Sequence, residues 1–451
     1  MNLMYRPWIA TAILLISAVH ATAAGVHPPL GFRADLADDE WIFGVPDLCS
    51  LPLRTTFGEV RIPLAQVDHV SPHHSADGIS VNFINGDRLT GTALLTNILL
   101  HGVFGDISVP LAQTVKLAVI EWDALPEATK QAYVSVPHTH YVAGEGAHIP
   151  PFTTWDDAAT SLVAAVRYSY SGDTVLVANG TYLLASCVDV DRGITLKGSG
   201  HPSDTIVDGS GRFRCFSLQH SNAVISALTI RNGYARTGGG VRLAPGTVES
   251  CFVISNSATG GGGGIYVDYK GGVVRNCIIS GNHAANNGGG VFFNNRGTIA
   301  NCLVVGNTSA FSGGGIQFYW GGSAKHCTIA RNAAAKRGGG ILPWGGQVAS
   351  SIIYSNIAPY GANFDHGNMG PFVHCCTMPM PPKGSGNLSA SPGFFSAEHW
   401  DFRLKGDSPA HGIGVDFEKL PAVAPGLLRR REIDNCAFQP DKSSVRGKPR
   451  R

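Results

Sequence analysis

The sequence predicts an all-β protein whose central part is a right-handed parallel β-helix, a solenoid with rungs of about 25 residues. The first observation is an asparagine that recurs at steps of 24, 26, 25, 25 and 24 residues. The second is a Gly triplet that recurs in the same register, and the third is a Cys or small residue five positions before each Asn. The Asn column comprises Asn232, Asn256, Asn282, Asn307, Asn332 and Asn356.

Other repeat folds do not fit this pattern. A Gly triplet in every unit would cost a helical repeat about 2 to 3 kcal/mol per unit. Propeller blades need about 40 residues, and the Leu framework of a leucine-rich repeat is absent. In a parallel β-helix, equivalent residues stack on neighbouring rungs about 4.8 Å apart. The Asn and Gly columns are therefore interpreted as structural, with Asn hydrogen-bonding at turns and Gly allowing sharp corners.

The N-terminus predicts an exported protein. A single Arg at position 6 is followed by an apolar run from Trp8 to Val19 and by Ala21-Thr22-Ala23, so residues 1–23 are expected to be a signal peptide. No later stretch reaches the roughly 18 apolar residues of a membrane helix. The net charge of +2 and the 15% of charged residues argue against a nucleic-acid partner. We expect a secreted or cell-surface protein, in the bacterial periplasm, at the outer membrane or outside the cell.

Residues 25–130 predict a small β-rich domain with an internal duplication. The segment FGEVRIPLAQ at 57–66 is repeated as FGDISVPLAQ at 104–113, with six of ten positions identical. Between the two copies, alternating residues around Asn85-Gly86 predict a β-hairpin. Residues 131–150 are expected to form a linker.

The β-helix is expected to span residues 151–415. Apolar residues at helical spacing behind a Thr cap predict a capping helix over 154–168 that covers the first rung. The segment SPGFFSAEHWDFRLKGDSPAHGIG is expected to close the coil at its other end. Residues 416–451 are expected to be a basic tail.

From Tyr141 to about Gln439 the chain resembles bacterial exported β-helix proteins of the pectin-lyase-like superfamily. Its rungs are similar to the repeats of chlamydial polymorphic outer membrane proteins, with Val or Ile where those repeats favour Phe. The resemblance is carried by HYVAGEGAHIPPFTTWDDAATSL, GDTVLVANGTY, the Cys-and-Gly rungs, SPGFFSAEHWDFRLKGDSPA and IDNCAFQ. It implies the fold, and it makes pectate lyase or polygalacturonase activity the natural catalytic hypothesis.

The acidic residues give this catalytic hypothesis little support. A hydrolase of this kind needs two carboxylates a few Å apart, but residues 227–356 contain only Glu249 and Asp268, at non-equivalent positions. A lyase would need Ca²⁺-binding Asp residues beside a Lys or Arg base, so Ca²⁺ is expected only under that alternative. No other cofactor and no metal site are expected. The weak catalytic candidates are Asp204, Asp208 and Lys325.

The ten cysteines are interpreted individually. Stacked Cys251, Cys277, Cys302 and Cys327 have parallel Cβ vectors, which disfavour the disulfide torsion, so they are expected to be buried thiols. One of Cys375 and Cys376 is expected to rejoin this column. The pairing of Cys49, Cys187, Cys215 and Cys436 stays open.

The strand after each Gly triplet provides the ligand-binding hypothesis. If its first residue, such as Ile265, Val291 or Ile316, points inward, alternation places aromatic and amide side chains outside. Flat rings and amides along a solenoid axis suit a polysaccharide or cell-surface glycan, although packing against residues 25–130 would also explain them. The predicted function is non-catalytic binding of glycans or other surfaces, with a polysaccharide lyase or glycoside hydrolase as the alternative. The ligand-binding candidates are Tyr266, Asp268, Phe292, Asn294, Tyr319, Trp320 and Trp344.

Overall fold

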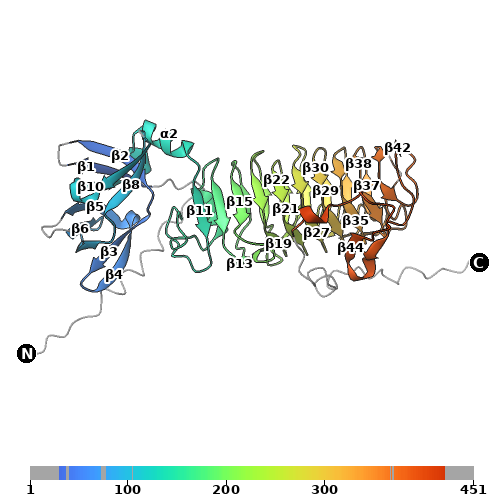
Figure 1. Cartoon of the computed structure of the whole chain (residues 1–451), viewed down its shortest axis with the longest axis horizontal. Coiled ribbons are helices and arrows are strands. Elements are labelled where there is room, and N and C mark those ends of the chain that lie inside the picture. The colour runs from blue at the N-terminus through green and yellow to red at the C-terminus, as the bar shows by residue number, and fades with distance from the viewer. Residues whose placement is uncertain are drawn as a thin grey trace, which may run out of the picture.

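The computed structural model describes residues 30–36, 40–72, 78–103, 105–365, 367 and 370–421 of the 451. The expected signal peptide, Phe104 of the duplication, Cys436 and residues 422–451 lie outside this set. A compact N-terminal sheet domain adjoins one end of a long β-helix (Figure 1). Within the described residues, no helix is long and apolar enough to cross a membrane.

The N-terminal domain is a ten-stranded antiparallel sheet, which confirms the predicted β-rich domain. Short 3-10 helices, η1 (Leu64–Gln66) and η2 (Leu111–Gln113), follow its fourth and ninth strands. The sheet encloses one apolar core. Its strands are β1 (Gly31–Leu36), β2 (Trp41–Pro46), β3 (Ser50–Thr55), β4 (Gly58–Pro63), β5 (Val67–Pro72), β6 (Gly78–Phe83), β7 (Arg88–Ala93), β8 (Asn97–Gly102), β9 (Gly105–Pro110) and β10 (Thr114–Ile120).

The duplication covers the whole domain. Each of β1 to β5 begins 47 residues before its counterpart in β6 to β10, as with Gly31 and Gly78 (78 − 31 = 47). The two halves exchange partners, because β1 pairs with β10 while β6 pairs with β5. The predicted hairpin is present, with Asn82 opposite Arg88 across the Asn85-Gly86 turn. The sequence signal of one repeated decapeptide therefore marked a complete five-stranded repeat.

The predicted linker over 131–150 is largely ordered structure. A 3-10 helix, η3 (Trp122–Ala124), leads into α2 (Glu127–Ser135), which packs on β8 and β2. Strand β11 (Thr139–Val142) then pairs in parallel with β12. The β-helix thus starts at Thr139, before the predicted boundary, because residues 139–142 supply the first strand on which later rungs stack.

The β-helix is built from four parallel sheets. Sheet 1 has eleven strands, sheet 2 nine, sheet 3 seven and sheet 4 five. Sheet 1 contains β11, β12 (Thr174–Val177), β15 (Thr195–Gly198), β18 (Val224–Ser226), β22 (Thr247–Glu249), β26 (Val273–Arg275), β30 (Thr298–Ala300), β34 (Ser323–Lys325), β38 (Gln347–Ala349), β40 (Phe372–Val373) and β42 (Gly384–Ser385). Sheet 2 contains β13 (Gly180–Leu183), β16 (Thr205–Asp208), β19 (Thr229–Arg231), β23 (Phe252–Ile254), β27 (Ile278–Ser280), β31 (Leu303–Val305), β35 (Thr328–Ala330), β39 (Ile352–Tyr354) and β41 (Cys376–Thr377).

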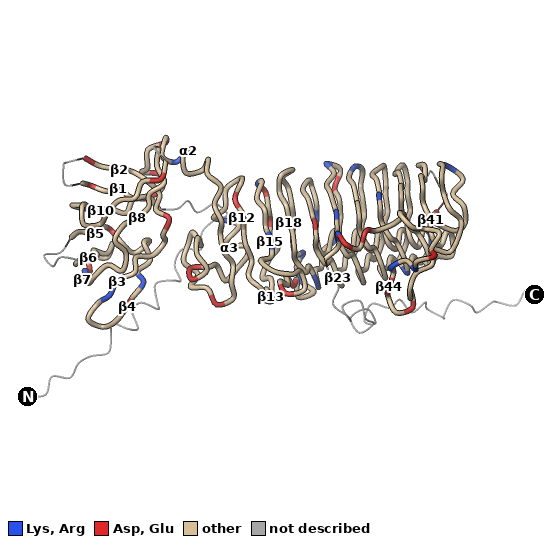
Figure 2. Tube along the Cα trace, in the orientation of Figure 1, with Lys and Arg blue, Asp and Glu red and all other residues tan. Residues whose placement is uncertain are grey.

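The other two sheets have shorter strands. Sheet 3 contains β14 (Val188–Val190), β17 (Phe216–Leu218), β21 (Val241–Leu243), β25 (Ile265–Val267), β29 (Val291–Phe293), β33 (Ile316–Phe318) and β37 (Ile341–Pro343). Sheet 4 contains β20 (Tyr234–Ala235), β24 (Ser257–Ala258), β28 (His283–Ala284), β32 (Thr308–Ser309) and β36 (Ala333–Ala334). One continuous apolar core runs inside the coil from Val142 to Cys375. Acidic and basic residues are sparse along the rungs (Figure 2).

The capping helix is shorter than predicted. Helix α3 spans Leu162–Tyr168, and its Leu162, Ala165 and Val166 are buried. The N-terminal half of the predicted helix is a turn, because the carbonyls of Asp156 and Ala158 accept from the backbone N–H groups of residues 147 and 148. Those carbonyls are thus not available for helical hydrogen bonds.

The Asn column is a buried hydrogen-bond ladder. In each step the side-chain Nδ2 donates to the next Asn Oδ1, as from Asn282 to Asn307 at 2.9 Å. The predicted first member, Asn232, is one residue out of register, because Gly233 donates from its backbone N to Asn256. Asn232 has φ 51°, the left-handed conformation that precedes each ladder position. The ladder therefore begins at Asn256, and Leu228, not Ala227, occupies the cysteine column in the same rung.

The cysteine column consists of buried free thiols, as predicted. Cys251, Cys277, Cys302 and Cys327 are free and fully buried. Ser351 continues the column, and Cys375 comes after it, with its Sγ 3.5 Å from the Val348 carbonyl. Cys49, Cys187 and Cys215 are also free.

The C-terminal segment lies along the side of the β-helix and does not close its end. It contains the hairpin β43 (Phe394–Ser396) and β44 (Asp401–Leu404), η4 (Ala397–His399) and η5 (Phe417–Lys419). Phe402 and Leu420 pack on the outer face of sheet 2, against apolar side chains such as Phe252 and Leu303. Figure 1 shows this segment running back along the rungs. The predicted position at the end of the coil is wrong because the repeat pattern does not reveal that the outer face of sheet 2 is apolar.

Candidate functional site

The candidate ligand-binding residues lie on the outer face of sheet 3. Each of its later strands has only three residues and comes after a Gly corner, so the first and third side chains enter the core and the middle one points outward. Ile265, Val291, Ile316 and Ile341 are fully buried, as predicted. The outward column, from first rung to last, is Arg242, Tyr266, Phe292, Gln317 and Leu342.

The outward side chains pack onto the Gly corner of their own rung. A Cβ built on Gly288 would lie 2.8 Å from Cβ of Phe292, and one on Gly313 would lie 2.7 Å from Cβ of Gln317. These glycines also have φ of 62° and 63°. The first Gly of each triplet therefore both turns the chain and makes room for the side chain above it.

Aromatic rings form a continuous row along this face. Tyr266 and Phe292 stack with centroids 5.3 Å apart and planes at 6°. Phe292 is 6.2 Å from Tyr319, which is 6.2 Å from Trp344 and 5.1 Å from Trp320. The row crosses successive rungs, so it runs along the solenoid axis.

Exposure divides the row into a buried base and an exposed rim. Trp320 is 68% exposed, Tyr269 59% and Tyr319 38%, whereas Phe292 is only 8% exposed. The prediction that Phe292 and Asp268 face solvent is wrong. Phe292 is sandwiched between Tyr266 and the Gly261 corner, and Asp268 is buried by its ion pair.

Ion pairs bound the row at both ends. Arg242 Nη2 lies 2.5 Å from Asp268 Oδ2, and Arg337 Nε lies 3.1 Å from Asp365 Oδ2. Burial and the nearby carboxylate of Asp268 raise the pKa of Tyr266, which is therefore a neutral hydroxyl donor. Between the two pairs, Gln317 Oε1 and Trp344 Nε1 are buried without a hydrogen-bond partner among the described residues.

Tyr269 could not be identified from the strand pattern. It comes after the buried Asp268, whose Oδ1 accepts from the Tyr269 backbone N at 2.7 Å, and this turn directs the ring outward. The available signal was its place at the corner after a sheet 3 strand, as for Trp320 one residue after Tyr319. Alternation along the strand cannot place such residues because the chain leaves the strand before them.

Comparisons with known proteins agree with this architecture. A model described as a right handed beta helix region matches residues 187–368. The chain is a right-handed parallel β-helix protein. The match confirms the predicted fold, which is that of the pectin-lyase-like superfamily, while bacterial origin and the chlamydial type of repeat stay predictions.

Solved structures similar to this β-helix protein include two with pectin-related titles. The crystal structure of pectate lyase Pel9A has 14% sequence identity and a TM-score of 0.41, covering 61% of this chain and 92% of its own. A pectin methylesterase in complex with a hexasaccharide has 12% identity and a TM-score of 0.29, covering 64% and 99% respectively. No curated protein matches the chain.

The weak catalytic candidates of this β-helix protein lie apart from one another. Asp204 and Asp208 stand before and at the end of β16, about 13 Å apart at a strand rise of about 3.3 Å per residue. Asp208 is buried and accepts from Arg231 Nε at 2.8 Å and Asn232 Nδ2 at 2.9 Å, which makes it part of a structural network. Lys325 is exposed on β34 between Ala300 and Ala349, so no carboxylate faces it across the sheet. Among the described residues, no group of three or more His, Cys, Asp or Glu is arranged to hold a metal.

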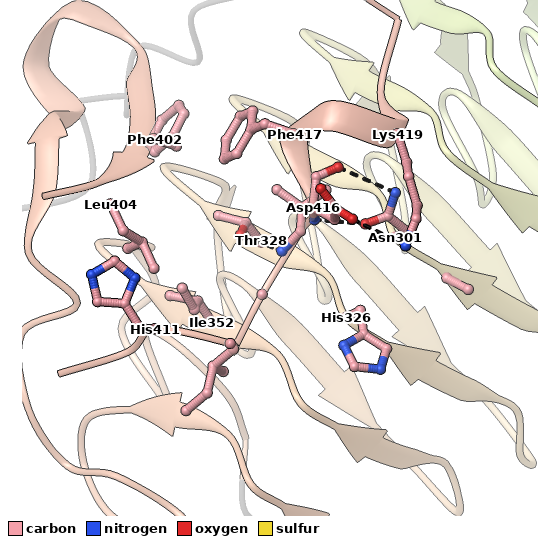
Figure 3. Close-up of a pocket in the computed structure, with 15 residues that line it drawn as sticks. Asn301, His326, Thr328, Ile352, Phe402, Leu404, His411, Asp416, Phe417 and Lys419 are labelled. Carbon is pink, nitrogen blue, oxygen red and sulfur yellow. Dashed lines mark hydrogen bonds and ion pairs between the residues drawn. The ribbon is translucent and has the colours of Figure 1, made fainter. Parts of the chain in front are cut away.

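A pocket of about 570 Å³ lies between the C-terminal segment and the corner of sheets 1 and 2 (Figure 3). Asp416 and Val415 attach the segment, since their backbone N–H groups donate to Asn301 Oδ1 at 2.7 Å and Thr328 Oγ1 at 3.2 Å. Lys419 pairs with Asp416 at 3.0 Å. His326 and His411 line the pocket, but neither pairs with a carboxylate among the described residues. The polar groups of this pocket thus mainly hold the segment in place.

Proposed function

We propose that this β-helix protein is a non-catalytic glycan-binding protein of the cell exterior, and that it binds a polysaccharide along the outer face of sheet 3. The observation that carries the proposal is the row of stacked rings with an exposed rim, formed by Tyr269, Tyr319 and Trp320. Soluble proteins seldom expose such a patch without a partner.

The chemistry of the rim suits a sugar polymer. Exposed aromatic rings offer flat apolar surfaces for the C–H faces of pyranose rings, while their polar tips remain hydrogen-bonding groups. Asn294 and Asn295 stand on the rung between Tyr269 and Trp320 and supply amides for hydroxyl groups. The unsatisfied Trp344 Nε1 and Gln317 Oε1 offer a further donor and acceptor to a ligand that reaches between the rings.

The spacing of the row favours a polymer over a monosaccharide. Adjacent rungs are about 4.8 Å apart. A hexose residue in a β-linked chain is about the length of one rung, so several sugar units would contact successive rings at once. Weak contacts that repeat along one chain add up through effective concentration.

The alternative is polysaccharide cleavage on the same fold. The early Asp residues would be needed for it, with Ca²⁺ if the enzyme were a lyase. The engagement of Asp208 by Arg231 and Asn232, and its distance from Asp204, favour the binding function over this alternative.

The test is a screen of the purified mature protein against acidic and neutral polysaccharides. Binding is measured by affinity electrophoresis, and cleavage by reducing ends and absorbance at 235 nm. We expect retardation by at least one polymer without cleavage, and its loss in Trp320→Ala and Tyr319→Ala. Tyr234→Ala, which removes a half-exposed ring on sheet 4, is the matched control and should bind as wild type. Cleavage of a polymer would refute the non-catalytic proposal, and equal binding by all variants would refute the site.

A further inference from the structure

A cluster of ionisable side chains joins the N-terminal domain to the first rung of the β-helix. Its centre is Asp173, which stands just before β12 and is 1% exposed. Two histidines of the β11 segment face it. His140 Nε2 lies 3.0 Å from Asp173 Oδ2, and His138 Nδ1 lies 3.6 Å from Asp173 Oδ1.

Both ring nitrogens of His140 face oxygen atoms that can only accept. Nδ1 lies 2.6 Å from the Pro151 carbonyl, and Nε2 faces the Asp173 carboxylate. A neutral imidazole can donate from only one nitrogen, so only the doubly protonated ring satisfies both contacts. His140 is 1% exposed, and water does not replace a lost contact there.

Asp173 is held as a buried carboxylate. Burial alone would raise its pKa, but hydrogen bonds from His138 and His140 and from the backbone N–H groups of Tyr170 and His138 outweigh burial and lower the pKa. Those backbone bonds are 2.6 Å from Tyr170 and 2.7 Å from His138. Among the described residues, its ion-pair partners are the two histidines, with no Lys or Arg. The positive charge that balances Asp173 must therefore come from a histidine proton.

His138 connects this charge pair to the N-terminal domain. Its ring stacks on Tyr133 of α2, with centroids 4.1 Å apart and planes at 24°. It also meets the edge of His101 on β8 at 5.9 Å. Tyr133 in turn packs with Val45 and Leu125 in a small apolar cluster. A change in the charge of the Asp173 site is thus transmitted to the surface on which the domain rests.

The remaining charged groups around the cluster are accounted for by other partners. His101 pairs with Asp106 at 2.7 Å, at the position where the duplicated hairpin has Arg54 and Glu59. Burial raises the pKa of Asp47, which also lies near His101. Burial raises the pKa of Tyr170 to about 12, and that of Tyr133 is raised for the same main reason. Arg192 donates from Nη1 to the Ser169 carbonyl at 2.9 Å.

We propose that His138, Asp173 and His140 form a pH-sensitive clasp that holds the N-terminal domain on the β-helix while His140 carries both protons. The sign depends on the proton that leaves. When the pH rises and His140 gives up a proton, one of its two contacts is lost and Asp173 loses its balancing charge, so the domain is held less firmly. On the acid side the clasp is lost only below the ordinary range of a carboxyl group, about pH 4, because the pKa of Asp173 is lowered.

The protonation of His140 is measured directly by ¹⁵N NMR of histidine-labelled full-length protein. We expect both nitrogens of one histidine, assigned by its absence in His140→Gln, to carry protons at pH 7. A spectrum in which that ring carries a single proton at pH 7 would overturn the proposal, whatever the variant does to folding.

The release of the domain is measured by hydrogen exchange of α2 and β8 between pH 6.5 and 9, corrected for intrinsic exchange. In the wild type the corrected exchange should rise with pH, towards the limit of about tenfold per unit for release of one proton. His140→Gln and Asp173→Asn should exchange faster at pH 6.5 and lose this dependence. His148→Gln is the control, since His148 bonds to Thr160 outside the clasp, and it should keep the wild-type profile. A His140→Gln variant with the wild-type pH dependence would also overturn the proposal.

Discussion

The inside and the outside of the later rungs differ in how far they repeat. Inside, the Asn ladder, the cysteine column and the third residue of the Gly corner recur from rung to rung with the same contacts. Outside, the equivalent position of sheet 3 is Arg242, Tyr266, Phe292, Gln317 and Leu342 in turn. A stacked coil demands identity where neighbouring rungs touch, whereas its outer face is free to vary. The varied face is therefore where a function can be placed without disturbing the fold.

The largest effect should come from filling a repeated corner. A Cβ on Gly289 would lie 2.3 Å from the Thr308 carbonyl oxygen and 2.4 Å from that of Gly314. Because both atoms are backbone of the next rung, Gly289→Ala should lower the free energy of unfolding by about 3 kcal/mol or more. Chemical denaturation measures the change. Gly144→Ala, which meets nothing within 4 Å, is the control, and equal stability of the two variants would contradict this view of the corner.

Breaking the Asn ladder should be next in size. Asn307 accepts from the backbone N and the Nδ2 of Asn282 and donates to the Ile279 carbonyl. Asn307→Ala leaves these buried groups unpaired, at a cost of about 2 to 4 kcal/mol. The outer-face variant Asn294→Ala should change stability by less than about 0.5 kcal/mol. Similar losses in both, measured by thermal and urea unfolding, would remove the distinction between inside and outside.

The cysteine column should make stability depend on alkaline pH. Burial raises the pKa of Cys327 to about 12, and that of Cys302 is also raised well above its usual value by burial. Since the unfolded thiols ionise near pH 8.5 to 9 while the folded ones do not, the stability they contribute is present below that range and is lost as the pH rises. Urea midpoints should therefore fall above pH 9. Cys302→Ser introduces the residue that Ser351 already supplies in this column, so the variant should remain folded and show a smaller slope of this fall.

The smallest effect on stability is expected at the exposed rim. Trp320 is 68% exposed and lies beyond the end of its strand, so Trp320→Ala should change the free energy of unfolding by no more than about 0.5 kcal/mol. A loss of several kcal/mol in a melting experiment would mean that the ring belongs to the core and not to a binding surface.

The period, the ladders and the inward strand positions could be predicted from the sequence because a residue required on every rung leaves a regular spacing. The same reasoning placed Asn232 in the ladder, although Gly233 fills that position, because spacing alone cannot show which of two neighbours faces inward. It also left Phe292 exposed, because the Gly corner that covers it is a tertiary contact. Tyr269 and the path of the C-terminal segment could not be predicted because both depend on how the chain turns after leaving a strand, and the repeat does not encode that turn. Whether the rim residues bind a ligand stays a prediction.

The most direct measurement is a crystal structure of the mature protein with an oligosaccharide of the polymer that it binds in the screen. The binding account predicts sugar rings over Trp320, Tyr319 and Tyr269, with the chain running along the solenoid axis. A sugar located instead in the pocket beside His326 and His411, or beside Asp204, would contradict it.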